Sequence, residues 1–178
     1  YPAYPYWFSG TTSGEPTSPY DYFGIDSYGF WAGHKWIESS RQNPSIHWAQ
    51  NITMPVNMSD YKIADVNVST LINATVTDNI DVLGDAIGSQ YVTFDYAVIY
   101  VRIADLARTK VYDLARYRTT SLGLGDPSPD QRYTTAVSNL ANTYLTMVSQ
   151  ADAEFYLTSV LDVDDYHFTL ILGIDFHS

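Results

Sequence analysis

The C-terminal stretch Tyr166–Phe176 carries the feature that most constrains the fold. Every second side chain along it is apolar, and these residues are Phe168, Leu170, Leu172, Ile174 and Phe176. Successive side chains of a β-strand point to opposite faces of a sheet, so the alternation predicts a strand with one buried face. A buried sheet face needs a second layer to cover it. We therefore expect at least two packed layers.

Further strand patterns occur from Ser45 onward. In Val66–Val76 the even positions are mostly apolar and the odd positions mostly polar, which predicts a strand with one buried and one solvated face. Tyr91–Ile103 is β-branched and aromatic on both faces, as expected of a central strand. Thr109–Thr119 is predicted as a strand that follows the short polar connection Asp105–Arg108.

The composition favours the same fold class. Aspartate accounts for 17 of the 20 acids, while the helix formers Glu and Lys number 3 each. Plentiful Thr, Val, Tyr and Ser, with Asp in the turns, are typical of β-proteins. Two apolar runs, Tyr144–Val148 and Glu154–Leu161, can each form a short helix. With about eight strands, the sequence predicts an all-β, antiparallel two-sheet β-sandwich of jelly-roll or immunoglobulin-like type.

The N-terminus has the composition of an extended aromatic arm. Its aromatic residues are Tyr4, Tyr6, Trp7 and Phe8. Three of them alternate at period two, so an extended chain places their rings on one face. Pro2 and Pro5 restrict the arm to a sheet edge or to a position outside a strand ladder. We expect residues 1–19 to form the arm and a linker, and residues 20–178 to form one β-sandwich domain with an aromatic, loop-rich lead-in at 20–44.

Residues 20–36 mix aromatic residues with glycines and show no helical periodicity. This composition predicts an irregular loop layer packed over a sheet, and a dedicated binding surface is the alternative. Such a surface would stack aromatic rings on sugar rings, with Asp and Asn completing the hydrogen bonds. The stacking candidates are Trp31, Trp36 and Trp48, with Tyr20, Tyr22 and Tyr28 nearby. Burial of these rings under the loop layer is the competing interpretation.

Charge, cysteine content and absent motifs exclude several classes. The net charge of −11 opposes binding to nucleic acid and to anionic membrane surfaces. The absence of cysteine removes thiol catalysis, Cys-ligated zinc and disulfides. No run of about 18 apolar residues is present, so we expect no membrane-spanning segment. The sequence also lacks the serine-hydrolase elbow, the H-E-x-x-H motif, the P-loop and the dinucleotide fingerprint, and we do not expect an enzyme.

Four N-glycosylation acceptor motifs fall within 25 residues, at Asn51, Asn57, Asn67 and Asn73. Asn67 and Asn73 share the polar positions of the predicted strand 66–76, where a bulky N-linked glycan is tolerated. Chance clustering in a chain rich in Thr and Ser is the alternative. Glycosylation implies export, so we expect an extracellular or cell-surface protein in its mature form after signal-peptide removal. A trimmed chain would look the same.

Aspartates gather in three predicted loops. They are Asp78, Asp81 and Asp85 in the first loop, Asp126 and Asp130 in the second, and Asp162, Asp164 and Asp165 in the third. Calcium takes about six to eight oxygen ligands, which sandwich loops can supply. None of the loops has EF-hand spacing, and solvated turn aspartates are the alternative. The four histidines, His34, His47, His167 and His177, show no metal-ligand spacing, and His167 fits a solvated strand position.

Four stretches carry a resemblance to a group of known proteins. Residues 52–77, 94–106, 154–161 and 164–176 are similar to secreted archaeal β-sandwich surface glycoproteins, including those of the Asgard group. The likeness implies an exported, glycosylated surface domain without known chemistry, and it includes no catalytic motif. The aromatic N-terminal stretch also resembles, in layout only, archaeal extracellular filament subunits. In those subunits an N-terminal strand inserts into the sandwich of the neighbouring subunit.

Two functions fit these features. The first is a structural subunit of an extracellular filament or cell-surface assembly, in which the arm pairs with a sheet edge of another copy and its alternating rings fill pockets there. A head-to-tail contact of this kind gives a homopolymer. The second is a carbohydrate-binding module or adhesin domain on a cell or virion surface. We predict the first, because an arm and linker precede a sandwich with exposed edges.

Overall fold

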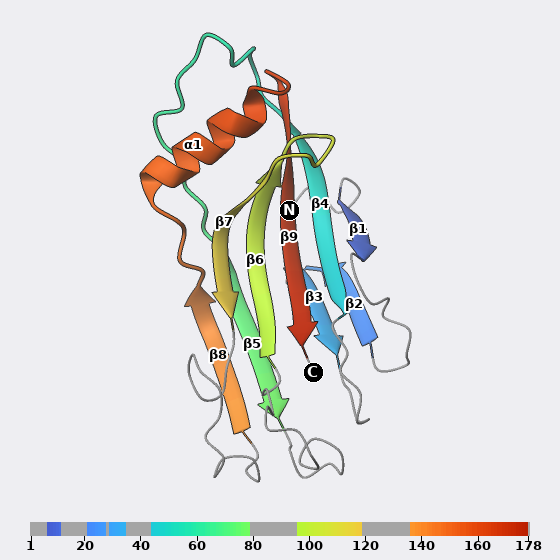
Figure 1. The fold of residues 1–178 in the computed structure, drawn as a ribbon. Coiled ribbons are helices and arrows are strands. Elements are labelled where there is room, and N and C mark those ends of the chain that lie inside the picture. The colour runs from blue at the N-terminus through green and yellow to red at the C-terminus, as the bar shows by residue number, and fades with distance from the viewer. Residues whose placement is uncertain are drawn as a thin grey trace, which may run out of the picture.

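The structure, a computed structural model, describes residues 7–11, 21–27, 29–34, 44–78, 96–118 and 136–177 (Figure 1). The strands are β1 (Phe8–Thr11), β2 (Asp21–Asp26), β3 (Gly29–His34), β4 (Ser45–Thr53), β5 (Leu71–Asp78), β6 (Tyr96–Ala104), β7 (Val111–Arg118), β8 (Ala136–Tyr144) and β9 (His167–His177), and the helix is α1 (Gln150–Leu161). The described chain is mostly β, with antiparallel strand pairs, as the sequence predicts.

Five strands form the main sheet, in the order β1-β4-β9-β6-β7. β9 lies at the centre, and its register pairs Leu172 with Trp48 of β4 on one side and with Val101 of β6 on the other. Phe168, Leu170 and Leu172 of β9 pack against one apolar cluster, so the alternation read from the sequence is confirmed for this part of the strand. The main sheet thus supplies the face that a second layer must cover.

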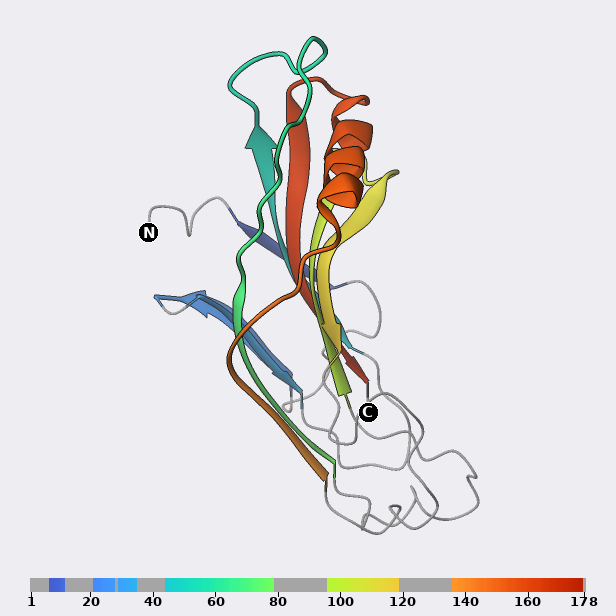
Figure 2. The ribbon, with the colours of Figure 1, turned by 90° about the vertical axis from the view of Figure 1, so that its left-hand side faces the viewer.

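Two antiparallel strand pairs, the hairpin β2–β3 and the non-consecutive pair β5–β8, form separate two-stranded sheets. Figure 2 shows both pairs on the same side of the main sheet. Over the described residues the sheets stay open and do not close into a barrel. The second layer is therefore divided, while the main sheet is continuous.

The core lies between the main sheet, α1 and the second layer. Its buried members are Ile72, Val101, Ile103, Leu114, Ala115, Leu145, Ala153 and Val160. α1 follows the N-cap residue Ser149, whose hydroxyl accepts a hydrogen bond from the backbone N–H of Asp152 at 3.2 Å. Ala153 and Val160 face inward near the two ends of this helix. Among the described residues, no helix has the length and apolar character needed to cross a membrane.

On the opposite face of the main sheet, long side chains lie flat over the strands. Tyr100 of β6 stands opposite Gly173 of β9, and a Cβ on that glycine would lie 2.1 Å from the tyrosine ring. The guanidinium carbon of Arg102 lies 3.6 Å from the centroid of the same ring, and Arg102 pairs with Asp113 of β7. Burial, together with the carboxylate of Asp175, raises the pKa of Tyr100. Tyr100 is therefore enclosed by groups of its own sheet.

The turn between β6 and β7 is organised by Asp105, which is fully buried. Its carboxylate accepts hydrogen bonds from Thr109 Oγ1 at 2.9 Å and from the backbone N–H of Lys110 at 2.6 Å. These bonds hold both residues in the turn, so β7 begins at Val111 and the predicted start at Thr109 is wrong. The connection is correspondingly longer than the predicted 105–108.

Other predicted boundaries also differ from the structure. The strand predicted at 66–76 begins only at Leu71, because residues 54–70 run without a strand ladder. Val66 and Val68 still pack against the core, so the predicted alternation of buried and exposed positions holds there. The run 144–148 is not a helix. Its first residue ends β8, and the backbone N–H groups of Leu145 and Val148 donate to Thr70 and Leu114 instead of within a helical turn. The run 154–161 does belong to α1. Residues 91–95 of the predicted central strand lie outside the described residues.

The loop layer predicted at 20–36 is instead the hairpin β2–β3 over residues 21–26 and 29–34. The glycines there make room for rings on the facing strand. Gly24 stands opposite Trp31 and Gly33 opposite Tyr22, and a Cβ would lie 2.5 Å and 2.2 Å from those rings, respectively. Only glycine leaves this space, so these glycines belong to the strands.

Candidate functional site

A groove lies between the β2–β3 hairpin and the β5–β8 pair, above the main sheet. Its volume is about 430 Å³, which is within the usual range for ligand pockets. One wall is the start of β3, residues 29–31, and the other is the start of β5 with the preceding residue, 70–73. The floor residues are Trp48, Ile99, Leu172 and Ile174. Tyr100 and Gly173, whose ring contact is on the other face of the sheet, also border the groove, and Asp26 completes the lining. The groove therefore has a mainly apolar floor between two strand edges.

Neither wall has a second partner strand among the described elements. β3 pairs with β2, and β5 pairs with β8. An unpaired strand edge presents backbone N–H and C=O groups to which another extended chain can bind. The arrowheads of β3 and β5 point the same way in Figures 1 and 2, so a chain running in the opposite direction would be antiparallel to both. The groove has the form of a sheet that lacks one strand.

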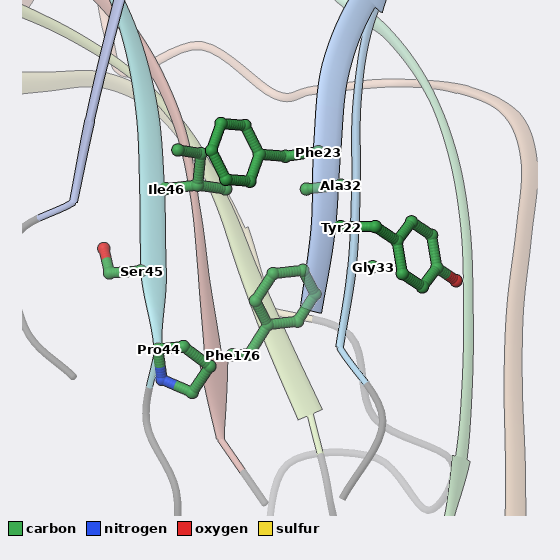
Figure 3. A pocket seen from close by; sticks show the side chains of 8 residues that line it. All are labelled: Tyr22, Phe23, Ala32, Gly33, Pro44, Ser45, Ile46 and Phe176. Atoms are coloured by element: carbon green, nitrogen blue, oxygen red, sulfur yellow. The ribbon is translucent and has the colours of Figure 1, made fainter. Parts of the chain in front are cut away.

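The other end of the β2–β3 hairpin is filled. Figure 3 shows Phe23 and Ala32 of the hairpin opposite Ile46 of β4 and Phe176 of β9. The space left there is about 10 Å³, too little for more than one water molecule. His34 adds a ring contact to Phe176, with centroids 5.7 Å apart. The hairpin is thus anchored at this end and stands beside the groove at the other.

Consecutive contacts between aromatic rings connect Trp7, the residue before β1, to the groove. Trp7 meets Phe30 edge-on, with ring centroids 4.9 Å apart. Phe30 in turn lies 5.2 Å from Trp48, and both of these residues line the groove. The ring of Trp7 therefore packs directly on a groove residue.

β1 follows Trp7 immediately and forms an edge of the main sheet. It pairs with β4 from Phe8 opposite Ala49 to Thr11 opposite Ile46. This segment, predicted as arm and linker, therefore belongs to the sheet. Tyr4 and Tyr6 of the predicted arm lie outside the described residues.

The outer face of the β2–β3 hairpin carries an exposed aromatic pair. Tyr22 is 59% exposed and Trp31 41%, with ring centroids 6.2 Å apart. The register places Asp26 on the same face of the hairpin. Trp48 is 1% exposed and offers no ring face to a sugar. The remaining aromatic candidates, Trp36, Tyr20 and Tyr28, lie outside the described residues.

Three of the four acceptor asparagines are exposed. Asn67 and Asn73 occupy exposed positions that alternate with buried ones, as the sequence pattern predicts. Asn51 lies on β4, and its Oδ1 accepts a hydrogen bond from Thr169 Oγ1 at 3.0 Å. A glycan on Asn51 or Asn67 would project from the described surface, whereas a glycan on Asn73 would stand at the wall of the groove.

Asn57 differs because it is half-buried and bonded on both sides of its amide. Its Oδ1 accepts a hydrogen bond from the backbone N–H of Ser59 at 2.8 Å, and its Nδ2 donates to Asp165 Oδ2 at 3.5 Å. A glycan on Nδ2 would have to share the space of this second contact. Asn57 is the least accessible of the four acceptors.

The aspartates of the α1–β9 turn bind within the turn. Asp164 accepts a hydrogen bond from the backbone N–H of Tyr166 at 2.9 Å and faces His167 Nδ1 at 3.0 Å, and these contacts lower the pKa of Asp164. Asp165 binds Asn57, and Asp162 is exposed. In the described part of the chain, no group of three His, Asp or Glu side chains could hold a metal ion. The other calcium candidates lie outside this part, namely Asp81, Asp85, Asp126, Asp130 and the side chain of Asp78.

His47 of β4 has the one buried side-chain nitrogen that lacks a hydrogen-bond partner among the described residues, namely Nδ1. Its Nε2 lies 3.3 Å from Nη1 of Arg108. Because a guanidinium can only donate, Nε2 is the acceptor and Nδ1 carries the proton. Burial lowers the pKa of His47, Arg108 and Arg102 lower it further, and Asp175 opposes them. His47 is therefore neutral in the folded protein at pH 7.

Comparison with known proteins adds no relative to these observations. The chain matches no protein-family model, no curated protein and no solved structure.

Proposed function

We propose that the protein is a structural subunit of an extracellular filament or cell-surface assembly, in which the N-terminal arm of one copy adds as a strand to the groove of the next. The observation that carries the proposal is the groove itself, an apolar floor between two unpaired strand edges that run in the same direction. An antiparallel guest would hydrogen-bond to both edges and bury alternate side chains on the floor. It would also join the β2–β3 hairpin and the β5–β8 pair into one sheet. A complete sandwich, of jelly-roll or immunoglobulin-like type, would then form on assembly.

The arm has the pattern that such a guest needs. Tyr4 and Tyr6 alternate, so one face of an extended arm brings two rings to an apolar floor, while Phe8 stays in β1 of its own sheet. Residues 1–6 reach about 20 Å when extended, which is ample for a groove between two strands. The backbone N–H groups of successive strand residues point to opposite edges, so Pro2 and Pro5, at an even and an odd position, remove one donor from each edge. Trp7 packs on Phe30 of the same chain, so the described chain begins beside its own groove. Strand addition between copies requires residues 1–6 to reach the groove of the next copy.

Export and glycosylation belong to the same proposal, as does kinship with secreted archaeal surface glycoproteins. The exposure of Asn51, Asn67 and Asn73 supports N-linked glycans at these positions. The test is the intact mass of the native protein, which should exceed the 20.0 kDa of the bare chain. A mass equal to the bare chain would contradict glycosylation and leave assembly to be judged separately.

We propose no catalytic role. The described lining of the groove holds a single carboxylate, Asp26, whereas glycoside hydrolysis uses a pair. Strand addition requires backbone groups and apolar side chains, and no metal.

Deletion of residues 1–6 tests the assembly mechanism. This change removes the donor segment and leaves Trp7, β1 and the groove in place. The truncated chain should stay monomeric by sedimentation velocity and form no filaments in negative stain, while the full chain assembles. A peptide of residues 1–6 should bind to the truncated chain. Assembly by the truncated chain as by the full chain would contradict the mechanism.

A matched pair of substitutions tests the acceptor. Leu71 and Val111 are the first residues of β5 and β7 and are 51% and 45% exposed, respectively, but only Leu71 lines the groove. Leu71→Glu places a charge at the groove and should abolish peptide binding. Val111→Glu places the same charge elsewhere and should leave binding unchanged. Equal loss in both variants would place the acceptor outside the groove.

Carbohydrate binding is the second candidate function, and the exposed Tyr22–Trp31 pair beside Asp26 favours it. Aromatic rings stack on sugar rings, and a carboxylate can accept hydrogen bonds from sugar hydroxyls. Tryptophan fluorescence titrated with polysaccharides should change in the native chain and not in Trp31→Ala. No response to any sugar would leave the structural function as the better explanation.

A further inference from the structure

The β6–β7 hairpin has a charge opposite to that of the rest of the chain. Residues 102–118 contain five of the nine bases and two of the 20 acids, a net charge of +3. The remaining residues contain four bases and 18 acids, a net charge of −14. The bases of the hairpin are Arg102, Arg108, Lys110, Arg116 and Arg118. Positive charge is therefore concentrated in one short segment of an acidic protein.

Arg102, Arg108 and Arg116 form what we call the arginine face. The side chain of Arg116 is 57% exposed, and its guanidinium lies 3.9 Å from Asp113, which also pairs with Arg102. One carboxylate therefore serves two guanidinium groups. Arg108, in the turn, is also exposed. Guanidinium groups thus occupy the outer surface here.

The other carboxylates of this region already have partners. Asp105 is buried and binds Thr109 and Lys110 within its turn. Asp175 is half-buried and accepts a hydrogen bond from Ser45 Oγ at 2.6 Å. Arg108 and Arg116 are the exposed bases of the arginine face.

The acidic counterpart, which we call the acidic end, lies around the α1–β9 turn and the adjoining residues 54–70. It comprises Asp60, Asp65, Asp162, Asp164 and Asp165, with Lys62 as the base among residues 54–70. Two backbone hydrogen bonds join its segments, from Met58 N to Asp165 O at 2.9 Å and from Met54 N to Tyr166 O at 2.7 Å. Three of the five aspartates are exposed, and the α1–β9 turn lies at the upper end of Figure 1. This end offers carboxylates to a cationic partner.

We infer that the arginine face of one copy docks on the acidic end of a second copy. The inference rests on the proposed self-assembly and adds a second contact, electrostatic and separate from the groove. Charge complementarity favours a second copy, because every neighbour in such an assembly brings this acidic end with it. The two patches consist of different residues, so a contact between them is heterologous and can continue from copy to copy.

Two charge reversals of equal size test the contact in the full chain. Arg116→Glu and Lys62→Glu each change the net charge by the same amount, but only the first removes positive charge from the arginine face. At about 20 mM salt, Arg116→Glu should raise the concentration at half-assembly about tenfold, whereas Lys62→Glu should not raise it. Light scattering and sedimentation measure both. Equal weakening in the two variants would mean general charge repulsion and would overturn the inference.

A charge swap tests the partner patch. Asp162→Lys alone should weaken assembly, and combined with Arg116→Glu in one chain it should restore assembly toward the native concentration. Raising the salt to about 300 mM should weaken native assembly and remove most of the difference between variants. Failure of the double variant to recover, with both single variants folded by circular dichroism, would overturn the inference.

The outcomes separate this contact from the groove mechanism. Loss of assembly on deletion of residues 1–6, without any effect of Arg116→Glu, would support the arm and overturn the arginine contact. Assembly that ignores the deletion but responds to the charge swap would support the arginine contact and contradict strand addition. Arg116-dependent binding of an anionic polysaccharide, with unchanged assembly, would also overturn the inference.

Discussion

The main sheet and the second layer contain similar residues, yet only the main sheet is continuous. Its five strands share one antiparallel ladder, and central residues such as Val101 and Ala115 are fully buried. The second layer is divided into the β2–β3 hairpin and the β5–β8 pair, with a groove between them and exposed rings outside. Because burial of apolar area stabilises the folded state, we expect the main sheet to contribute most of the folding free energy. The divided second layer is where the proposed partner strand would add.

The largest expected effect is the loss of stability when a tryptophan of the main sheet is removed, compared with the loss when one of the second layer is removed. Trp48→Ala removes a fully buried ring from the main sheet and should lower the free energy of unfolding by about 3–5 kcal/mol. Trp31→Ala removes a partly exposed ring and should cost about 1 kcal/mol. Urea unfolding followed by circular dichroism measures both. Equal costs would show that the second layer is as important for stability as the main sheet.

Two glycine substitutions sharpen the comparison. Gly173→Ala drives a methyl group into Tyr100, which is held between the main sheet and Arg102, and should cost about 2–3 kcal/mol. Gly33→Ala has the same clash with Tyr22, but this ring is exposed and can turn away, so we expect less than about 1 kcal/mol. Thermal unfolding separates the two variants. A larger cost at Gly33 would contradict the expectation that the main sheet contributes more to stability than the second layer.

Substitution of Asp105 tests whether the β6–β7 turn contributes to the stability of the main sheet. Asp105→Ala removes the buried acceptor of Thr109 Oγ1 and of the Lys110 backbone N–H and should cost about 1–2 kcal/mol, while Asp113→Ala, at a half-buried side chain, should cost about 0.5 kcal/mol. Burial raises the pKa of Asp105, but the hydrogen bonds from Lys110 and Thr109 outweigh it and the net pKa is lowered. The stabilisation is therefore present above about pH 4 and lost as the pH falls through the lowered pKa. Denaturant midpoints at neutral and acid pH measure this loss, which Asp105→Ala should reduce.

The smallest expected effect concerns His47. Its pKa in the folded protein lies below 6.5, so the unfolded chain takes up a proton first as the pH falls. Stability should therefore be full above pH 6.5 and decline below it until the folded pKa is passed. The melting temperature of the native chain should fall between about pH 7 and pH 5.5, and His47→Gln should reduce this fall. An unchanged pH profile in His47→Gln would assign the decline to other groups.

The fold class could be read from the sequence because strand alternation is a local pattern. The C-terminal strand is the clearest case, since its apolar side chains repeat within one segment. The hairpin β2–β3 was missed because its glycines resemble loop residues. A usable signal was present: Tyr22 and Gly24 mirror Gly33 and Trp31 about the turn, which places each ring opposite a glycine.

The groove could not be predicted in the same way. Its walls and floor come from strands far apart in the sequence, and no local pattern states which strands lie side by side. Ile72 illustrates the limit, because its burial is readable from alternation while its position at the groove is not. The start of α1 was readable in principle, since Ser149 and Asp152 form an N-terminal cap.

The ring-covered glycines have a consequence for the backbone around them. Tyr22, Trp31 and Tyr100 each lie over a bare stretch of main chain where a glycine offers no side chain of its own. Water that would otherwise compete for the inter-strand hydrogen bonds meets an aromatic face instead. In a chain without disulfides, part of the aromatic content thus serves to keep solvent away from the ladder, so these amides should be among the slowest to exchange their hydrogens within their strands.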